Sequence, residues 1–210
     1  TYISTLHYVM EAAAEQNIPL IVLDRPNPNS HYIDGPVLES KFKSFVGMHP
    51  VPVVYGMSIG EYAQMINGEK WLKNGIQCQL NVIKNLHYTH KSKYVLPVKP
   101  SPNLPNAKSI NLYPSLCFFE GTNISCGRGT DKQFQLFGSP HLPEQIYVYQ
   151  FTPQPNEGAK QPLFQGEICN GINLEMQPQL HQLNLKWLQD SYRNHPDQST
   201  FFNDYFNTLA

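Results

Sequence analysis

"PLIVLD", residues 19–24, is the stretch that decides the fold of the first part of the chain. Four consecutive apolar residues, two of them β-branched, predict a short strand that is buried on both faces of a parallel sheet. Before it, apolar side chains recur at three- and four-residue steps over residues 3–13, which predicts a helix that ends near Asn17. A helix followed by a buried strand is half of a parallel α/β unit.

The segments that follow repeat this order. Ser58 and Glu61 form a Ser-x-x-Glu capping box before an apolar helical face, and Gly68 fits the end of that helix. The stretch "IQCQLNVI", residues 76–83, then predicts a second strand. Residues 1–84 therefore predict helix, strand, helix and strand in an open, mostly parallel sheet with helices on both faces.

A proline-rich run, residues 96–106, predicts a stiff and extended joint. Beyond it the pattern changes to strand-like segments at 145–155 and 165–176, an amphipathic helix over 178–194 and a further helix that starts near residue 200. We therefore expect an α/β domain over residues 1–108 and a smaller α+β domain over residues 109–210.

Composition excludes several classes of protein. Lys and Arg number 15 against 16 Asp and Glu, so a net charge of −1 provides no field for nucleic acid or an anionic membrane. No apolar run is long enough to span a bilayer, and no signal peptide is visible in a chain that begins inside a helical pattern. We expect an interior piece of a longer protein.

The four cysteines have spacings that match no zinc motif. We expect them to be free and buried, although Cys117 and Cys126 could pair with each other. No ligand spacing among the histidines places a metal site, so we expect neither a metal nor a cofactor.

Polar residues follow the first predicted strand directly. Asp24, Arg25 and Asn27 lie where it ends, and open α/β sheets bind ligands beyond the carboxyl ends of their strands. Two interpretations stay open: Asp24 braces the turn and pairs with Arg25, or the group binds a ligand. Glu61, in contrast, is assigned to the cap of its own helix.

"EGTNISCGRGT", residues 120–130, combines one acid, one Arg and three glycines directly after an apolar run. A loop of this composition is expected to bury little. Glu120 follows apolar residues and is suited to acid catalysis, while Arg128 between glycines can present its planar fork to a carboxylate or phosphate. The glycine spacing matches no phosphate-binding loop. The alternative is a structural loop held by a Glu120–Arg128 pair.

Several stretches occur in an order that resembles the NamZ family of exo-β-N-acetylmuramidases over essentially the whole chain. They are "TYIST", "IVLDRPNP", "DGPVLE", "SFVGMHPVPVVYGMSIGE", "PSPNLP" and "EGTNISCGRGT". The resemblance implies a Rossmann-like α/β domain with a smaller attached domain and an active site in a cleft. It also implies export from the cytoplasm and release of N-acetylmuramic acid from the non-reducing ends of peptidoglycan fragments.

From this resemblance we expect Glu120 to act on the glycosidic bond together with a carboxyl group from a Pro-Glu-His-Gly motif upstream of Thr1. Arg128 would bind the lactyl carboxylate of muramic acid and Asn123 would help to hold the sugar. The strand-end group at residues 24–27 would line the same cleft. The alternatives are a non-catalytic module that binds cell-wall sugars and a nucleotide-binding α/β enzyme.

Overall fold

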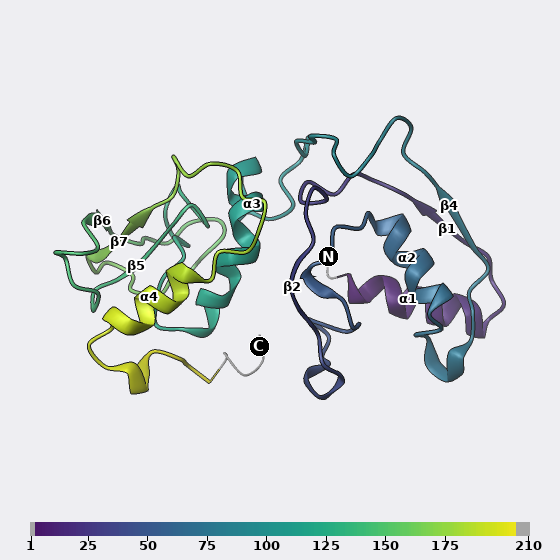
Figure 1. The fold of residues 1–210 in the computed structure, drawn as a ribbon, viewed down its shortest axis with the longest axis horizontal. Helices are drawn as coiled ribbons and strands as arrows, with labels where there is room; N and C mark the ends of the chain where they lie inside the picture. The colour runs from purple at the N-terminus through teal and green to yellow at the C-terminus, as the bar shows by residue number, and fades with distance from the viewer. Residues whose placement is uncertain (1–2, 205–210) are drawn as a thin grey trace. The chain divides into compact units, whose positions relative to one another are not determined.

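The computed structural model describes residues 3–204, and the chain divides into two compact units, residues 1–94 and 95–210 (Figure 1). Each unit combines helices with short strands, so the chain is of mixed α/β type. The division lies between Tyr94 and Val95, which assigns the proline-rich run to the second unit. The boundary expected from the sequence lies farther along, after residue 108.

The first unit follows the predicted order of helix, strand, helix and strand. Its elements are α1 (Ser4–Glu15), β1 (Leu20–Leu23), α2 (Ile59–Gly68) and β4 (Leu80–Ile83). Strands β1 and β4 pair in parallel, with Leu20 opposite Leu80 and Leu23 opposite Ile83. The capping box of α2 forms as predicted, since Ser58 Oγ accepts from the Glu61 backbone and the Glu61 carboxylate accepts from the Ser58 backbone.

An antiparallel pair interrupts this pattern. Strands β2 (Asp34–Val37) and β3 (Pro52–Val54) pair between β1 and α2, where the sequence predicts neither strand, and the short helix η1 (Ser40–Phe42) lies between them. A further short helix, η2 (Lys73–Gly75), precedes β4. Among the described residues the parallel sheet therefore has two strands, and the expected mostly parallel sheet with helices on both faces is not what they form.

The prediction that β1 is buried on both faces is also wrong. Val22 is buried against α1 and α2, whereas Ile21 and Leu23 are 61% and 73% exposed. Successive side chains of a strand point to opposite faces, and the described helices pack on one face of β1 and β4 (Figure 1). A continuous apolar run therefore does not show whether one or both faces of the strand are covered by other elements.

A chain of polar side chains crosses the core of the first unit. His7 Nδ1 lies 2.9 Å from His49 Nε2, and His49 Nδ1 lies 3.0 Å from the Tyr62 hydroxyl. Trp71 stacks on His49 with ring centroids 4.9 Å apart. Burial, the charge of His7 and that of Lys43 lower the pKa of His49 to about 4, so this imidazole is neutral at pH 7.

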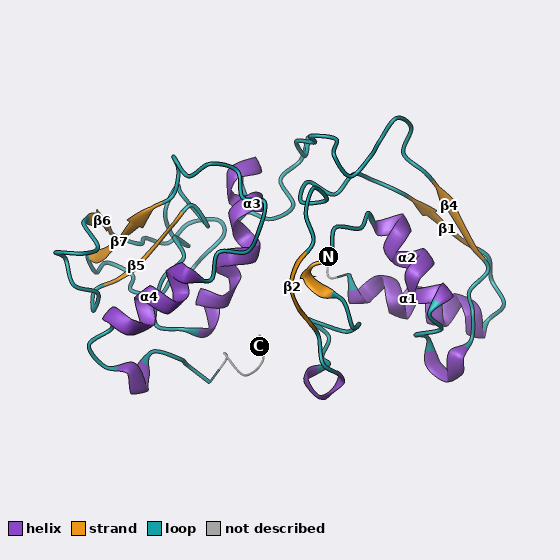
Figure 2. Cartoon of the chain, viewed as in Figure 1, coloured by secondary structure: helices purple, strands orange, loops and turns teal. Residues whose placement is uncertain are grey.

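Among its described residues, the second unit is built around a three-stranded antiparallel sheet, β5–β7–β6, with two α-helices and two short 3-10 helices (Figure 2). Its elements are α3 (Ala107–Leu116), η3 (Cys117–Gly121), β5 (Leu136–Ser139), β6 (Tyr149–Phe151), β7 (Cys169–Asn173), α4 (Lys186–Asn194) and η4 (Gln198–Thr200). Phe119 and Phe137 stack at 4.8 Å in its core, and Trp187 of α4 packs against Phe137.

Two predicted helices of this unit differ from the structure. The amphipathic pattern over 178–194 forms a helix only from Lys186, because the chain before it is used in contacts with α3: Leu180 donates to Asn111 and Asn184 donates to Ser115. The helix expected from about residue 200 lies largely outside the described residues. The strands at 149–151 and 169–173 lie within the predicted segments.

Candidate functional site

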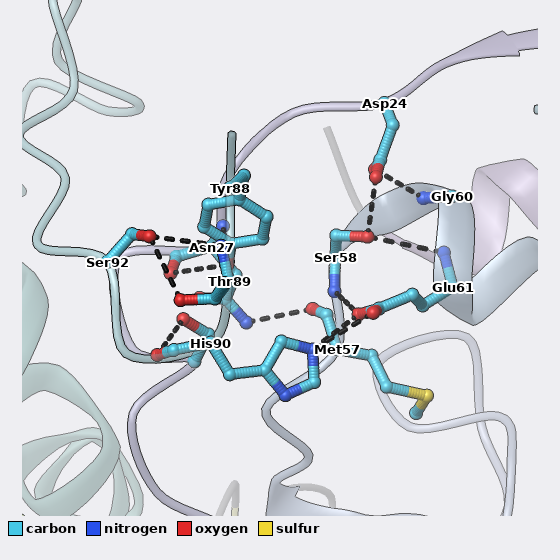
Figure 3. Close-up of polar contacts among 11 residues, drawn as sticks. Asp24, Asn27, Met57, Ser58, Gly60, Glu61, Tyr88, Thr89, His90 and Ser92 are labelled. Atoms are coloured by element: carbon cyan, nitrogen blue, oxygen red, sulfur yellow. Dashed lines mark hydrogen bonds and ion pairs between the residues drawn. The ribbon is translucent and has the colours of Figure 1, made fainter. Parts of the chain in front are cut away.

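Side chains from three segments meet at the carboxyl-terminal edge of the parallel pair β1 and β4. Asp24 follows β1, His90 lies on the loop after β4, and the N-terminus of α2 is held at the same edge (Figure 3). Parallel strands place their carboxyl ends together, which is where open α/β sheets bind ligands. We call this group, made of Asp24, Asn27, Ser58, Glu61 and His90, the strand-edge cluster.

Asp24 in this cluster is fully engaged with α2. Ser58 Oγ donates to Asp24 Oδ2 at 2.8 Å and the Gly60 backbone donates to Asp24 Oδ1 at 2.8 Å. A negative charge at a helix N-terminus is favourable, because unpaired N–H groups point out of it. Among the described residues Arg25 forms no ion pair with Asp24, and its side chain is exposed. Asp24 thus braces a helix and not its own turn.

Asn27 connects the loop after β1 to its neighbours. Its side-chain amide donates to the Met57 carbonyl at 2.9 Å and its Oδ1 accepts from the Asn29 backbone at 2.9 Å. Its backbone N–H donates to the Tyr88 hydroxyl at 3.1 Å. Both ends of the side chain are therefore occupied within the protein, and Asn27 shapes the edge of the cluster.

Glu61 and His90 form a carboxylate–imidazole pair that the sequence did not reveal. His90 Nε2 lies 3.0 Å from Glu61 Oε1 and 2.9 Å from Oε2. The side chain of Glu61 is 41% exposed and that of His90 is 46% exposed. Glu61 therefore keeps its capping role and still presents a carboxylate to solvent at the edge of the sheet.

The pKa of Glu61 is held below its usual range. Burial alone would raise it, but hydrogen bonds from the Ser58 backbone and from His90 outweigh that effect because they favour the charged form. Glu61 is therefore ionised at neutral pH. An ionised, accessible carboxylate can act as a base, orient a polar group or stabilise a developing positive charge.

The 120–130 loop of the second unit is buried to a much greater extent than its composition predicts. Ile124 is 1% exposed and Cys126 is 4% exposed. Ser125 pairs with Gly138 of β5 through two backbone hydrogen bonds of 2.8 and 2.9 Å, so the loop runs beside the sheet as an additional bridge. Expecting it to bury little was wrong because the loop completes the core of this unit.

The glycines of the loop fit this packing. Gly129 has a φ of +80°, and a Cβ there would lie 2.6 Å from Pro162 and 2.8 Å from the Gln154 carbonyl. The Gln154 backbone donates to the Gly129 carbonyl at 2.7 Å, which is the contact that close approach permits. The glycine thus serves the packing of a buried loop, and no ligand is needed to account for it.

Glu120 and Arg128 form an ion pair, as one of the two interpretations of the loop expects. Arg128 donates to Glu120 Oε1, and the side chains are 40% and 19% exposed for Arg128 and Glu120, respectively. The Arg128 guanidinium also lies over the Phe134 ring, 5.5 Å from its centroid. Its Nε is buried with no hydrogen-bond partner among the described residues.

A pocket of about 300 Å³ opens beside this ion pair. Its walls combine the two charged groups with hydroxyl, thiol, amide and apolar side chains: Phe119, Glu120, Thr122, Ile124, Ser125, Cys126, Arg128, Leu163 and Asn203. Asn123 lies next to this lining, and its side-chain amide donates to the Thr200 carbonyl. The pocket is suited to a small group that has both a charged and an apolar part.

The predicted site residues therefore fall into two places. Asp24, Arg25 and Asn27 belong to the first unit, whereas Glu120, Asn123 and Arg128 belong to the second. The expectation that they line one cleft stays a prediction. Sequence reasoning missed the Glu61–His90 pair and the Leu163 wall, because no local pattern relates residues that are far apart along the chain.

Other features of the described residues concern metals, thiols and membranes. Residues 3–204 contain no group of three or more His, Cys, Asp or Glu side chains arranged to hold a metal ion. All four cysteines are free, and three of them, Cys78, Cys126 and Cys169, are buried. None of the helices within this range has the length and apolar character that crossing a bilayer requires.

Comparison with known proteins covers both units. Residues 1–108 match the family model described as exo-beta-N-acetylmuramidase NamZ, N-terminal, and residues 111–210 match the one described as exo-beta-N-acetylmuramidase NamZ, C-terminal. The peptidoglycan beta-N-acetylmuramidase NamZ of Bacillus subtilis (strain 168) is 42% identical over 194 residues, or 83% of this chain and 44% of that protein. The chain thus spans less than half the length of this relative.

Two crystal structures of DUF1343 family proteins from Bacteroides fragilis NCTC 9343 have the same fold. One is 45% identical with a TM-score of 0.92 and is matched over 99% of this chain and 60% of its own. The other is 26% identical with a TM-score of 0.75 over 95% of this chain and 59% of its own. Both halves of the chain match successive parts of one family, and the chain therefore belongs to the NamZ family of exo-β-N-acetylmuramidases.

Proposed function

We propose that the protein containing this chain is an exo-β-N-acetylmuramidase that releases N-acetylmuramic acid from the non-reducing ends of peptidoglycan fragments. Family membership supports the reaction class. The choice of substrate is supported by the pocket of the second unit, which places a guanidinium beside an apolar wall. The proposal includes a Rossmann-like arrangement of the first domain in the longer protein and a site of action outside the cytoplasm, where peptidoglycan lies.

The lactyl group distinguishes muramic acid from glucosamine, and it has a carboxylate and a methyl group. Arg128 provides a planar fork for the carboxylate, and one of its N–H groups is already directed at Glu120. Leu163 and Ile124 provide an apolar surface for the methyl group. Asn123 uses its amide N–H on Thr200, which leaves Oδ1 to accept from a sugar hydroxyl or the acetamido group.

Hydrolysis of a glycosidic bond generally needs two carboxyl groups, or one together with the acetamido group of the substrate. We propose that Glu120 acts on the glycosidic bond as an acid/base or by orienting water. Besides the carboxyl group expected upstream of Thr1, we propose Glu61, which is ionised, as a second carboxylate that takes part in the reaction. Arg25 is exposed and can contact the saccharide, whereas Asp24 and Asn27 support binding by fixing the cluster around Glu61.

The proposal is tested with the full-length protein and a chromogenic muramic acid glycoside. Glu120→Gln and Glu61→Gln keep shape but not charge, so each is expected to lower kcat by about 10²-fold with the fold intact. Arg128→Ala is expected to weaken the binding of muramic acid substrates by roughly 1.5–3 kcal/mol, because one charge-assisted hydrogen bond is lost.

A matched N-acetylglucosamine glycoside, which lacks the lactyl group, is the control. An equal loss on both sugars after Arg128→Ala would show that Arg128 serves Glu120 and not the lactyl carboxylate. Near-normal kcat in Glu120→Gln would exclude Glu120 from the chemistry. Binding of muramic acid saccharides without any release would favour a sugar-binding module, and tight nucleotide binding would favour the nucleotide-binding enzyme.

A further inference from the structure

We infer that His90 is a positioning residue for the reaction: its imidazole holds the Glu61 carboxylate in the one orientation in which that carboxylate faces the substrate. This inference rests on the proposed function, in which Glu61 is a reacting carboxylate. His90 itself touches no substrate and acts through Glu61.

The contacts of the carboxylate define the orientation. Glu61 Oε2 accepts from the Ser58 backbone at 2.8 Å and from His90 Nε2 at 2.9 Å, whereas Oε1 has only the 3.0 Å contact to His90 (Figure 3). An ionised carboxylate has no proton to donate, so Nε2 carries the hydrogen of this bond. Oε2 therefore has two donors and Oε1 shares one of them, so Oε1 keeps lone pairs for a further partner on a side chain that is 41% exposed.

The Ser58 contact alone does not fix this arrangement. A capping-box carboxylate is held by a single backbone N–H and can rotate about its last bond, because terminal sp³–sp² torsions are broad. The second contact, from a different segment of the chain, removes that freedom. Asp24, the other carboxylate of the cluster, accepts from Ser58 Oγ and the Gly60 backbone, and as an acceptor it cannot replace His90 as a donor to Glu61.

The loop that carries His90 is itself held in place. Ser30, 4% exposed, donates through its hydroxyl to the His90 carbonyl at 3.0 Å. The Tyr88 hydroxyl accepts from the Asn27 backbone at 3.1 Å. A turn follows in which the Ser92 backbone donates to the Thr89 carbonyl at 2.9 Å. Hydrogen bonds before and after residue 90 thus hold the imidazole next to Glu61.

The test uses the full-length protein with four variants: His90→Ala, His90→Gln, Ser92→Ala and Glu61→Gln. His90→Ala removes the donor, whereas His90→Gln places an amide N–H near the position of Nε2. Ser92→Ala is the matched control, because it keeps the backbone bond from Ser92 to Thr89 and removes only the Ser92 Oγ contacts, 3.0 Å from Thr89 N, without touching Glu61. The readouts are kcat/KM against pH and an NMR titration of the Glu61 carboxyl carbon, assigned by its absence in Glu61→Gln.

We expect His90→Ala to raise the pKa of Glu61 in the titration, because a hydrogen bond to the charged form is lost. The acid limb of the kcat/KM profile then moves to higher pH, and kcat/KM at pH 7 falls about 10-fold as the carboxylate loses its orientation. His90→Gln restores most of the rate, and Ser92→Ala stays within about twofold of the parent protein.

Two results would overturn the inference, and they can be told apart. An unchanged titration and profile in His90→Ala, with Glu61→Gln inactive, would show that Ser58 alone orients the carboxylate. Full activity in Glu61→Gln would show instead that Glu61 does not react, and the inference would then fail together with that part of the proposed function. His90 is exposed, so its variants are expected to fold, and circular dichroism verifies this.

Discussion

Replacing Asp24 by Asn tests the bracing role that the structure gives to this residue. Its carboxylate accepts two hydrogen bonds of 2.8 Å, one from Ser58 Oγ and one from the Gly60 backbone. Asn keeps one acceptor oxygen and turns an NH₂ group towards the second donor. One bond to a charged group, about 1.5–3 kcal/mol, is lost, together with about 0.3–1 kcal/mol of charge–dipole energy at the N-terminus of α2.

We therefore expect Asp24→Asn to lower the free energy of unfolding of the first unit by about 2–4 kcal/mol. Urea unfolding of the 210-residue chain, followed by fluorescence, measures this value. The chain has two tryptophans, Trp71 in the first unit and Trp187 in the second, so a Trp187→Phe background makes Trp71 the reporter of the first unit. The two units need separate reporters, because they do not have to unfold together.

Glu39→Gln is the matched control for this substitution. Glu39 pairs with Lys41 at 2.9 Å, but both side chains are 65% exposed, so losing its charge is expected to change stability by less than about 0.5 kcal/mol. A double-mutant cycle with Ser58→Ala isolates the Asp24–Ser58 bond. An Asp24→Asn effect no larger than that of Glu39→Gln would refute the bracing role. In the full-length enzyme, a loss of kcat/KM with unchanged stability would favour direct ligand binding by Asp24.

Three further predictions concern stability and reactivity. Because the pKa of His49 is lowered to about 4, the folded state favours the neutral imidazole. Stability is therefore lost as the pH falls from about 6.5 towards 4, by at most about 3 kcal/mol. In His49→Gln the midpoint of urea unfolding is expected to depend less on pH over this range. Gly129→Ala is expected to cost more than about 2 kcal/mol, since its Cβ would lie 2.6 Å from Pro162, whereas Gly68→Ala, with nothing within 4 Å, is neutral or slightly stabilising in thermal melts. Burial raises the pKa of all four cysteine thiols, so a thiol reagent at pH 8 is expected to react slowly with the folded chain. In urea the same reagent is expected to react with all four cysteines. Rapid reaction of the folded protein would contradict this prediction.

Local patterns in the sequence were sufficient for the order of elements in the first unit. The apolar period of α1, the Ser58–Glu61 capping box, the apolar run of β1 and the alternating pattern of β4 all depend on residues close together along the chain. The family resemblance, carried by several motifs in order, was confirmed over both halves of the chain.

The same patterns failed where burial depends on distant partners. The run "LIVL" does not show that α1 and α2 cover only one of its faces, and the composition of residues 120–130 does not show that Ser125 pairs with Gly138. Likewise, the antiparallel pair β2 and β3 was missed because its two short strands have too few residues for a clear alternation.

What the sequence determined by itself was therefore the local structure, the cap of α2, the Glu120–Arg128 candidate pair and the family. Only the tertiary structure decided which groups each polar side chain contacts. Glu61 and His90 are 29 residues apart, and Ser30 and His90 are 60 apart, yet they meet because parallel pairing of β1 and β4 brings the segments after both strands to one edge. Hydrogen bonds act over about 3 Å of space, whatever the separation along the chain.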